Sequence, residues 1–182
     1  MKNDLLADLA RQAKKNDREA FGRIYDQCVD SVYRFVFYRV GRKQDAEDIT
    51  EDVFINAFQA IGRYEEREDI PFSAWLFRIA QNRVNDHYRR QARSRTVNIE
   101  DELLDGLNAS REPDPAVAAD ARQEVWGALG ELTDEQQNVI ILRFFVGLKI
   151  SEIAGFFGRS ETSVKALQHR ALKSLKRLLE KE

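Results

Sequence analysis

A dense cluster of carboxylates at helical spacing is the clearest chemical feature of this chain. Five of the eight residues from 45 to 52 are acidic, namely Asp45, Glu47, Asp48, Glu51 and Asp52. Two pairs of these acids lie four residues apart, and each such like-charge pair destabilises an isolated helix by roughly 0.2–0.5 kcal/mol. Because this repulsion lowers the stability of the helix, we expect the acids to be retained for binding a basic partner.

Two other interpretations of the acids remain open. The acids also suit a solvated helix face near the positive end of the helix dipole. Carboxylates three and four residues apart can share a cation, but the di-iron bundle pattern needs Glu-x-x-His pairs. The two histidines, His87 and His169, are not so placed. We therefore expect no metal site and no cofactor.

The acids are carried by a segment with a strong helical period. Small and branched apolar residues recur between residues 45 and 61 at the spacing of one helix face. That face must be buried, so the acids on the same helix must point outward. The apolar positions are Ala46, Ile49, Val53, Ala57 and Ala60.

A second candidate site combines arginines with amides. Arg78, Asn82, Asn85 and Arg89 share one stripe of a helix expected over residues 72–90. Amides can read base edges and arginines bind phosphates or guanine, so this stripe indicates contact with nucleic acid. Asp86 and Arg90 lie at its margin.

Aromatic residues accompany this basic stripe. Cations interleaved with aromatics suit unpaired bases, where each stacked base contributes roughly 1–3 kcal/mol. Most of these rings are expected in the core, because Phe72 has core spacing with Leu76 and Ile79. Tyr64 lies in a polar loop and is the one ring that we do not assign to the core.

The C-terminal segment has the pattern of a helix-turn-helix. A short apolar helix, ISEIAGFF, precedes a turn at Gly158 and Arg159, and Ser160 is placed to cap a longer helix from about Glu161. Such a pair inserts its second helix into the major groove of DNA. A generic helical hairpin is the alternative. The basic, hydroxyl-rich start of the second helix, with Ser163 and Lys165, favours DNA binding.

Charge is unevenly distributed along the 182 residues, although the formal net charge is only −2. Residues 78–95 hold six arginines against one aspartate, and residues 98–124 hold eight acids against two arginines. Residues 143–182 hold nine basic residues against four acids. Two basic segments separated by an acidic one indicate two contact points on a polyanion.

The cysteine content and hydropathy indicate a cytoplasmic protein. Cys28 is the only cysteine, so an internal disulfide is excluded and a reducing compartment is favoured. Its apolar neighbours predict a core thiol. The sequence shows neither a signal peptide nor a membrane span, so we expect no membrane insertion.

Helical periods dominate the chain and predict an all-α fold with two small helical domains. Helices are expected over residues 18–40, between Asp17 and Gly41, then over 45–61, over 72–90 and from a capping box at Thr133 to about Phe145. Between the domains the apolar period is lost and two prolines occur, which predicts a flexible linker. The expected limits are 1–92, a linker over 93–119, and 120–182.

These segments together resemble an extracytoplasmic-function sigma factor, a minimal promoter-recognition subunit of bacterial RNA polymerase. The motifs are an acidic DAED-x-x-x-x-x-F helix, the helix FSAWLFRIAQNRVNDHYRR, a proline-containing linker and a terminal helix-turn-helix, from about Phe21 to Leu179. In that family region 2 forms a helical bundle and region 4 forms the helix-turn-helix. The resemblance also implies an anti-sigma factor as a partner.

The resemblance implies three sets of site residues. Asp48, Glu51 and Asp52 would dock on the coiled coil of the largest subunit of core RNA polymerase. The −10 promoter element would be opened and held by Tyr64, Arg78, Asn82, Asp86, Arg89 and Arg90. The −35 element would be read by Ser160, Ser163, Lys165, His169, Arg170 and Lys173.

Two positions depart from the family pattern. Many members have Gln-Glu where this chain has Glu51-Asp52, so the acidic character is kept while the hydrogen bonds differ. Many have Ser-Arg where this chain has Ala166-Leu167. Direct readout of the −35 element would then depend more on Lys165, His169 and Arg170.

Two other functions compete with this assignment. One is a helix-turn-helix transcriptional regulator that binds operators without core polymerase. It would need a ligand pocket or a phosphoacceptor in the first half, and residues 1–92 show no aspartate carried by a strand. The other is an enzyme. The sequence lacks a plausible nucleophile, a metal-spaced histidine pair and a glycine-rich phosphate loop, so we expect no catalytic activity.

Overall fold

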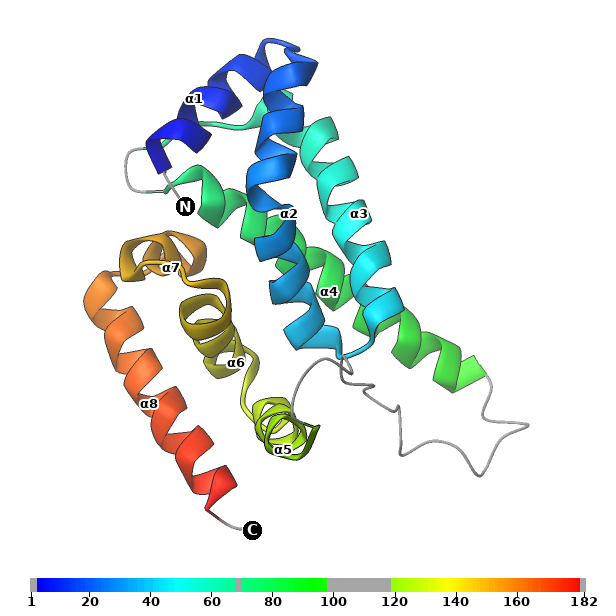
Figure 1. Cartoon of the computed structure of the whole chain (residues 1–182), viewed down its shortest axis with the longest axis vertical. Helices are drawn as coiled ribbons and strands as arrows, with labels where there is room; N and C mark the ends of the chain where they lie inside the picture. Colours follow the sequence, from blue (N-terminus) through cyan, green and yellow to red (C-terminus); the bar gives the residue numbers. More distant parts are fainter. Residues whose placement is uncertain (1–2, 68–69, 98–118, 181–182) are drawn as a thin grey trace.

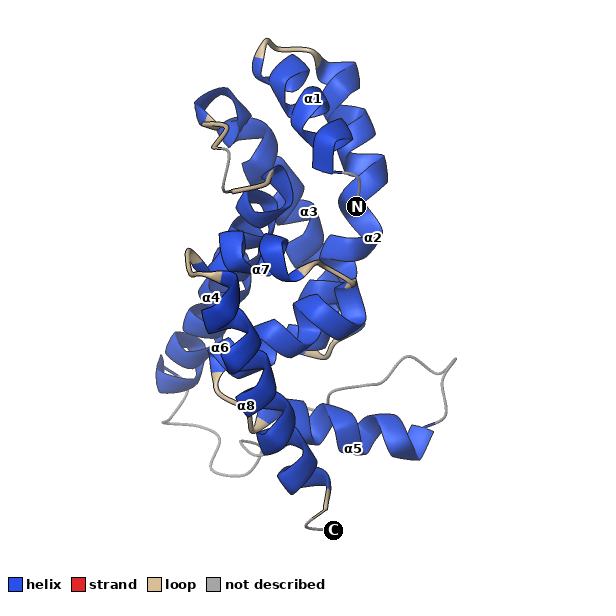
Figure 2. Ribbon diagram, turned by 90° about the vertical axis from the view of Figure 1, so that its left-hand side faces the viewer, coloured by secondary structure: helices blue, strands red, loops and turns tan. Residues whose placement is uncertain are grey.

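The computed structural model describes residues 3–67, 70–97 and 119–180, and every regular element in these ranges is helical (Figure 1). The predicted all-α class is thereby confirmed (Figure 2). The helices are α1 (Asn3–Lys14), α2 (Arg18–Val40), α3 (Lys43–Ala60), η1 (Ile61–Arg63), α4 (Phe72–Val97), α5 (Ala119–Gly130), α6 (Asp134–Ile140), the π-helical η2 (Ile141–Val146), α7 (Ile150–Phe157) and α8 (Glu161–Leu179).

Local capping signals set the helix ends. The side chain of Asp17 accepts the hydrogen bond that starts α2, and Gly41 ends that helix at a positive φ of 80°. Thr133 and Gln136 form the predicted capping box of α6, and the Ser160 hydroxyl caps α8. Each cap satisfies backbone groups that the helix itself leaves without partners.

Helices α1–α4 pack into one bundle around an apolar core. Ile24, Val32 and Phe35 of α2, Val53 of α3 and Phe77 of α4 have no exposed surface. Cys28 lies in the same core, as predicted, with 1% of its surface exposed. Burial raises the pKa of its thiol to about 12, because the thiolate loses its hydration.

Helix α1 is an element that the sequence reasoning did not predict. It buries Leu6, Leu9, Ala10 and Ala13, each no more than 4% exposed, against the rest of the bundle. The signal was present, because these residues follow the i, i+3, i+4, i+7 spacing of an amphipathic helix.

Helix α4 continues beyond its predicted end near Arg90 to Val97. The stretch from residue 91 contains neither glycine nor proline, so nothing in it terminates the helix. The first residues assigned to the linker are therefore helical. Most of the predicted linker, residues 98–118, lies outside the described part of the chain.

Helices α5–α8 form the second unit, with the predicted helix-turn-helix in α7 and α8. The turn depends on Gly158, whose φ of 63° is left-handed and favours glycine. The predicted helix from Thr133 to about Phe145 consists of α6 followed by the π-helix η2, and Gly147 ends it with a φ of 85°. Arg143 Nη1 donates to the Leu148 carbonyl at 2.8 Å and ties this turn to η2.

The two units pack against each other, with η2 against α2 and α7 against α4 (Figure 1). The ring of Phe35 on α2 lies 5.5 Å from that of Phe77 on α4 and 6.4 Å from that of Phe156 on α7. Nearby, Tyr38 stacks on Trp126 of α5 at 5.0 Å. The core is therefore continuous across both units.

Candidate protein and nucleic-acid interfaces

The acidic cluster of α3 is exposed, as its helical spacing predicts, but it faces two different neighbours. Glu47 and Glu51 lie on the rim of a groove shared with α2. Asp48 and Asp52 lie on the other side, facing α4. All four side chains are solvent-exposed. The carboxylates thus form one outer surface, which is bordered by the groove with α2 on one side and by α4 on the other.

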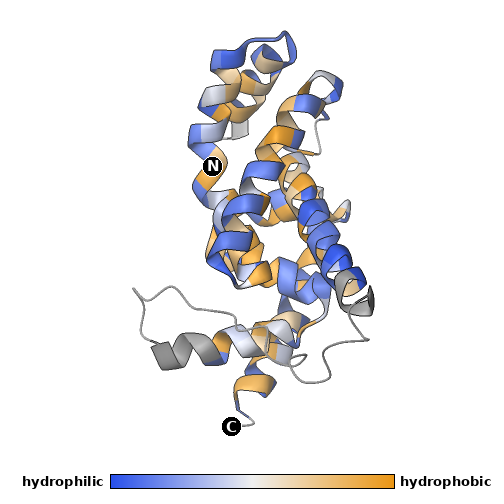
Figure 3. Cartoon of the chain, turned by 90° about the vertical axis from the view of Figure 1, so that its right-hand side faces the viewer, coloured by the Kyte–Doolittle hydropathy of each residue, from blue (hydrophilic) through white to orange (hydrophobic). Residues whose placement is uncertain are grey.

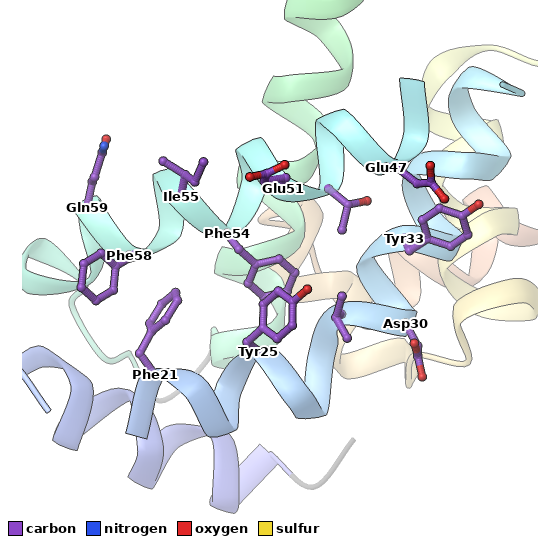
Figure 4. Close-up of a pocket in the computed structure, with 12 residues that line it drawn as sticks. Phe21, Tyr25, Asp30, Tyr33, Glu47, Glu51, Phe54, Ile55, Phe58 and Gln59 are labelled. Carbon is purple, nitrogen blue, oxygen red and sulfur yellow. The ribbon is translucent and has the colours of Figure 1, made fainter. Parts of the chain in front are cut away.

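The groove between α2 and α3 has a volume of about 720 Å³ and is lined mainly by aromatic and aliphatic side chains (Figure 4). Tyr25, Ile55 and Phe58 expose 44%, 46% and 47% of their surfaces, which is unusual for such large apolar residues. Edge-to-face ring contacts hold the lining in place, including Phe21 with Phe58 at 5.0 Å. An acidic rim beside an apolar groove suits a basic, amphipathic helix.

The opposite border of the acidic surface is a small hollow of about 190 Å³ against α4. Its basic residues include Arg83, His87 and Arg90. His87 Nε2 lies 3.8 Å from Asp45 Oδ2, and Arg42 Nη1 lies 3.7 Å from the same oxygen. Within the described ranges, no group of three or more His, Cys, Asp or Glu is placed to hold a metal ion.

Four of the six predicted −10 residues lie on the accessible surface of α4. Asn82, Arg89 and Arg90 are exposed, and Asp86 is half-buried. Asp86 sits between two cations, 2.7 Å from Arg83 Nη2 and 3.2 Å from Arg89 Nη1. The part of α4 that precedes its last turn is largely hydrophilic (Figure 3), which suits a nucleic-acid surface.

Tyr64 contradicts the prediction that it lies outside the core, because only 5% of its surface is exposed. Its ring packs edge-on against Phe72 at 5.3 Å and lies 5.1 Å from Trp75. Lys14 of α1 donates to its carbonyl at 2.8 Å. The loop turns back onto α4 immediately after η1, so Tyr64 is covered. Burial raises the pKa of its hydroxyl, and the negative charge of Glu66 adds to this effect.

Arg78 is engaged inside the molecule. Its Nε donates to the Phe156 carbonyl at 2.9 Å, and its Nη2 donates to the Gly155 carbonyl at 2.6 Å. Both acceptors lie at the C-terminal end of α7, where a cation also balances the negative end of the helix dipole. The structure therefore separates Arg78 from the exposed members of its predicted stripe.

The predicted −35 residues share the outer side of α8. Five of them are exposed and Ser163 is half-buried. Lys165 Nζ lies 3.9 Å from Glu161 Oε2. Such an exposed ion pair is weak, so the ammonium group remains available for another partner. The face includes Ser160, Ser163, Lys165, His169, Arg170 and Lys173, whereas Val164, Leu167 and Ala171 are buried on the inner side.

Two arginines matter more than the sequence reasoning recognised. Arg159, just before the cap of α8, makes a two-pronged ion pair with Glu135 of α6, at 2.9 and 2.5 Å. Arg39 of α2 is only 2% exposed. The sequence could have indicated this burial, because Arg39 lies four residues after Phe35 and three after Val36, at the helical spacing of a core position.

No helix in the described part of the chain is long and apolar enough to cross a membrane. The family model "Sigma-70 region 2" matches residues 24–94, and the model "Sigma-70, region 4" matches residues 128–177.

Similar proteins of known name span nearly the whole chain. The ECF RNA polymerase sigma factor BldN of Streptomyces coelicolor is 38% identical over 177 residues, which are 96% of this chain and 66% of that protein. The ECF RNA polymerase sigma factor SigX of Bacillus subtilis is 34% identical over 166 residues, 89% of this chain and 84% of that protein. Among solved structures, CnrH in complex with the cytosolic domain of CnrY aligns with a TM-score of 0.67 and 26% identity over 96% of each chain.

Proposed function

The chain belongs to the extracytoplasmic-function sigma factors of RNA polymerase, and on that basis we propose a division of labour between its two helical units. Helices α1–α4, called region 2 below, bind core polymerase and the −10 promoter element. Helices α5–α8, called region 4, read the −35 element. The observation that carries the proposal is the presence in one chain of an exposed acidic helix, α3, and an exposed recognition helix, α8.

Polymerase docks on the outer surface of α3 in this proposal. Asp48, Glu51 and Asp52 are exposed and supply the negative charge that attracts a basic coiled coil. The neighbouring groove gives the same partner an apolar seat, in which Ile55 and Phe58 are the most exposed contacts. Charge then directs the encounter, and burial of the groove stabilises the complex.

The −10 element binds along α4 in this proposal. Asn82 offers an amide to a base edge, and Arg89 and Arg90 are exposed, so their guanidinium groups can approach phosphates from the solvent side. Tyr64 is too buried to stack on a base and instead supports Phe72 and Trp75 from within. Trp75, half-buried at the edge of that cluster, is the better placed ring.

The −35 element binds α8 in this proposal. The hydroxyl groups and backbone amides at the start of α8 suit phosphate contacts, and the outward basic residues suit base edges in the major groove. Lys165, His169 and Arg170 carry most of this readout, because Ala166 is too small and Leu167 is buried.

An anti-sigma factor is a further proposed partner, and we place the protein in the cytoplasm. The proposal follows the solved structure of CnrH, which was determined with the cytosolic domain of CnrY. Like other sigma factors, the chain acts by binding and not by catalysis in this proposal.

Transcription with purified core polymerase tests the proposal. The chain and core enzyme together should yield specific transcripts from a genomic library, whereas either alone should not. Tight, sequence-specific operator binding by the chain alone, with no gain from polymerase, would instead support the regulator hypothesis.

A further inference from the structure

Asn85 lies in the predicted nucleic-acid stripe of α4, between Asn82 and Arg89. Three residues make about 300° of helical turn, so the side chains of Asn82 and Asn85 leave the helix axis only about 60° apart. Asn85 is half-buried and lines, with Arg89, a hollow of about 560 Å³ between α4 and the turn from α5 to α6. Its amide therefore lies beside the groups proposed to bind the −10 element.

The amide of Asn85 is held by the residue one helical turn earlier. Gln81 Nε2 donates to Asn85 Oδ1 at 2.7 Å, a contact that the i, i+4 spacing of a helix permits. An amide side chain has an acceptor oxygen at one end and a nitrogen with two N–H donors at the other. Because Gln81 engages the oxygen, Asn85 is left with its donor end for another molecule.

The surroundings of Gln81 favour this direction of the contact over the reverse. Gln81 Oε1 is buried and has no hydrogen-bond partner within the described residues. If both amides were turned over, Asn85 would donate to Gln81, and the Gln81 nitrogen would take the buried place with two N–H groups unpaired. Buried N–H groups without a partner are rarer in proteins than carbonyl oxygens with incomplete hydrogen bonding. The outward end of Asn85 is therefore its nitrogen.

Gln81 is a poor choice for stability alone. A buried acceptor without a partner lowers the stability of a fold, whereas an unbranched apolar side chain would fill the same place without that cost. An unpaired buried polar group in a native protein calls for an explanation. The direction that Gln81 imposes on the amide of Asn85 supplies one.

We infer that Gln81 is a positioning residue for −10 recognition, and that it makes Asn85 selective for a base that presents an acceptor. The inference rests on the proposed binding of the −10 element along α4 and adds a specificity residue to it. Thymine O4 and guanine O6 are acceptors, whereas cytosine N4 and adenine N6 carry donors. Asn85 therefore binds a keto base at one position of the element, and an amino base there would set N–H against N–H.

Promoter selection by the complete holoenzyme tests the inference. The chain and core polymerase are offered a promoter from the genomic library with its −35 element kept and its −10 element randomised. Wild type should select a keto over an amino base at one position by about two- to tenfold, the range expected for one net hydrogen bond. Asn85→Ala should lose the preference at that position and keep the others. An equal loss of affinity for every sequence would overturn the inference, because Asn85 would then contact a phosphate.

Bases that differ in one exocyclic group sharpen this measurement. Uracil and cytosine exchange a keto oxygen for an amino group, and so do hypoxanthine and adenine. The pair that matches the selected base is placed at that position of a premelted promoter, so that base pairing does not enter the comparison. The ratio of the two holoenzyme affinities cancels any general effect of a variant on charge or folding. A wild-type ratio that favours the amino base would overturn the inference.

Gln81→Glu should invert this ratio. A carboxylate at position 81 only accepts hydrogen bonds, so Asn85 must donate its Nδ2 to it and present Oδ1 instead. The holoenzyme should then bind the amino base better than the keto base, again by about two- to tenfold. A merely structural role of Gln81 would lower both affinities and leave their order unchanged. An unreversed ratio in the folded variant would overturn the inference.

Asn85→Asp should reach the same reversal without any change at Gln81. The Gln81 amide continues to donate, and the second carboxylate oxygen then faces the base as an acceptor. This variant replaces Gln81→Glu if the latter does not fold. A ratio that still favours the keto base in Asn85→Asp would count against the inference.

Matched variants complete the test. Gln81→Met removes the donor together with the unpaired oxygen, so it should fold as stably as the wild type and lose the keto preference without reversing it. Gln91→Glu adds the same charge to α4 at a half-buried position away from Asn85 and should keep the wild-type ratio. A full keto preference in Gln81→Met would overturn the inference. Absence of specific transcripts with the wild type would instead refute the proposed function.

Discussion

Helices α4 and α8 carry the two proposed DNA surfaces, but the structure treats them differently. On α8 the candidate side chains point to solvent while the opposite side is buried. On α4 one candidate, Arg78, binds region 4, and Asp86 lies between Arg83 and Arg89. One surface is ready for DNA, whereas the other is partly occupied by the molecule itself. Changes in region 2 should therefore alter assembly with core polymerase and promoter opening, and changes in α8 should alter DNA affinity alone.

The largest expected effect is loss of polymerase binding through region 2. Asp48→Lys/Asp52→Lys reverses the exposed charge of α3 and should abolish co-purification with core polymerase. Circular dichroism should remain unchanged, since neither side chain is in the core. Glu19→Lys/Asp26→Lys makes the same charge change on exposed positions of α2 and should assemble normally. Normal assembly by the α3 variant would exclude the docking assignment.

Phe35→Ala should destabilise both regions, because its ring contacts Phe77 of region 2 and Phe156 of region 4. Loss of a buried phenylalanine lowers the free energy of unfolding by about 3–5 kcal/mol. Urea unfolding followed through Trp75 and Trp126, one tryptophan in each region, should show both transitions at lower urea. If the Trp126 transition does not move, the regions unfold independently.

Lys165→Ala/Arg170→Ala should weaken −35 duplex binding while leaving folding nearly unchanged. Removal of two cations that face the DNA lowers the slope of log affinity against log salt by up to about 2, and surface changes alter the free energy of unfolding by no more than about 0.5 kcal/mol. Holoenzyme titrations at several salt concentrations measure the slope. Unchanged affinity and an unchanged slope would show that these cations do not contact the DNA.

Asn82→Ala should leave −35 binding intact and lower open-complex formation. The lost hydrogen bond to an unpaired base is worth about 0.5–1.5 kcal/mol, which is a reduction of roughly two- to tenfold. Permanganate footprinting of duplex and premelted promoters measures it, with only partial rescue expected on the premelted template. An equal defect in closed binding would contradict the separation of the two surfaces.

The smallest expected effect concerns the ion pair that fixes the turn before α8. Hydrogen bonding from Arg159 holds the pKa of Glu135 below its ordinary value of 4.5. A lowered pKa means that the carboxylate stabilises the fold above pH 4.5 and that this contribution is lost as the pH falls through the lowered value. Thermal unfolding of wild type and Glu135→Gln should therefore converge in acid. A difference in melting temperature that stays the same at every pH would show that the effect comes from packing and not from the ion pair.

Several features of the fold follow from local sequence signals. Asp17, Gly41, Thr133 and Ser160 act at helix ends within a few residues of themselves, so their roles were predictable. The exposed acids of α3 were predictable for the same reason, because helical periodicity fixes which residues share a face. The resemblance in turn identified the family, which the comparisons confirmed.

Other features depended on contacts between distant segments. Tyr64 looked like a loop residue, but α1 and the start of α4 cover it. Arg39 binds Gln137, 98 residues away, and Ser73 binds Glu152, 79 residues away. No local pattern identifies such partners, because the free energy of burying a polar group depends on what meets it.

The sequence by itself determined the helices, their caps, their buried sides and the residue types on the outer sides of α3, α4 and α8. Only the tertiary structure decided which helix covers each side. It divided the acids of α3 between an apolar groove and α4, and it assigned Arg78 to α7. The physical reason is that backbone hydrogen bonds and side-chain period act along a helix, whereas packing joins surfaces that the chain order leaves unspecified.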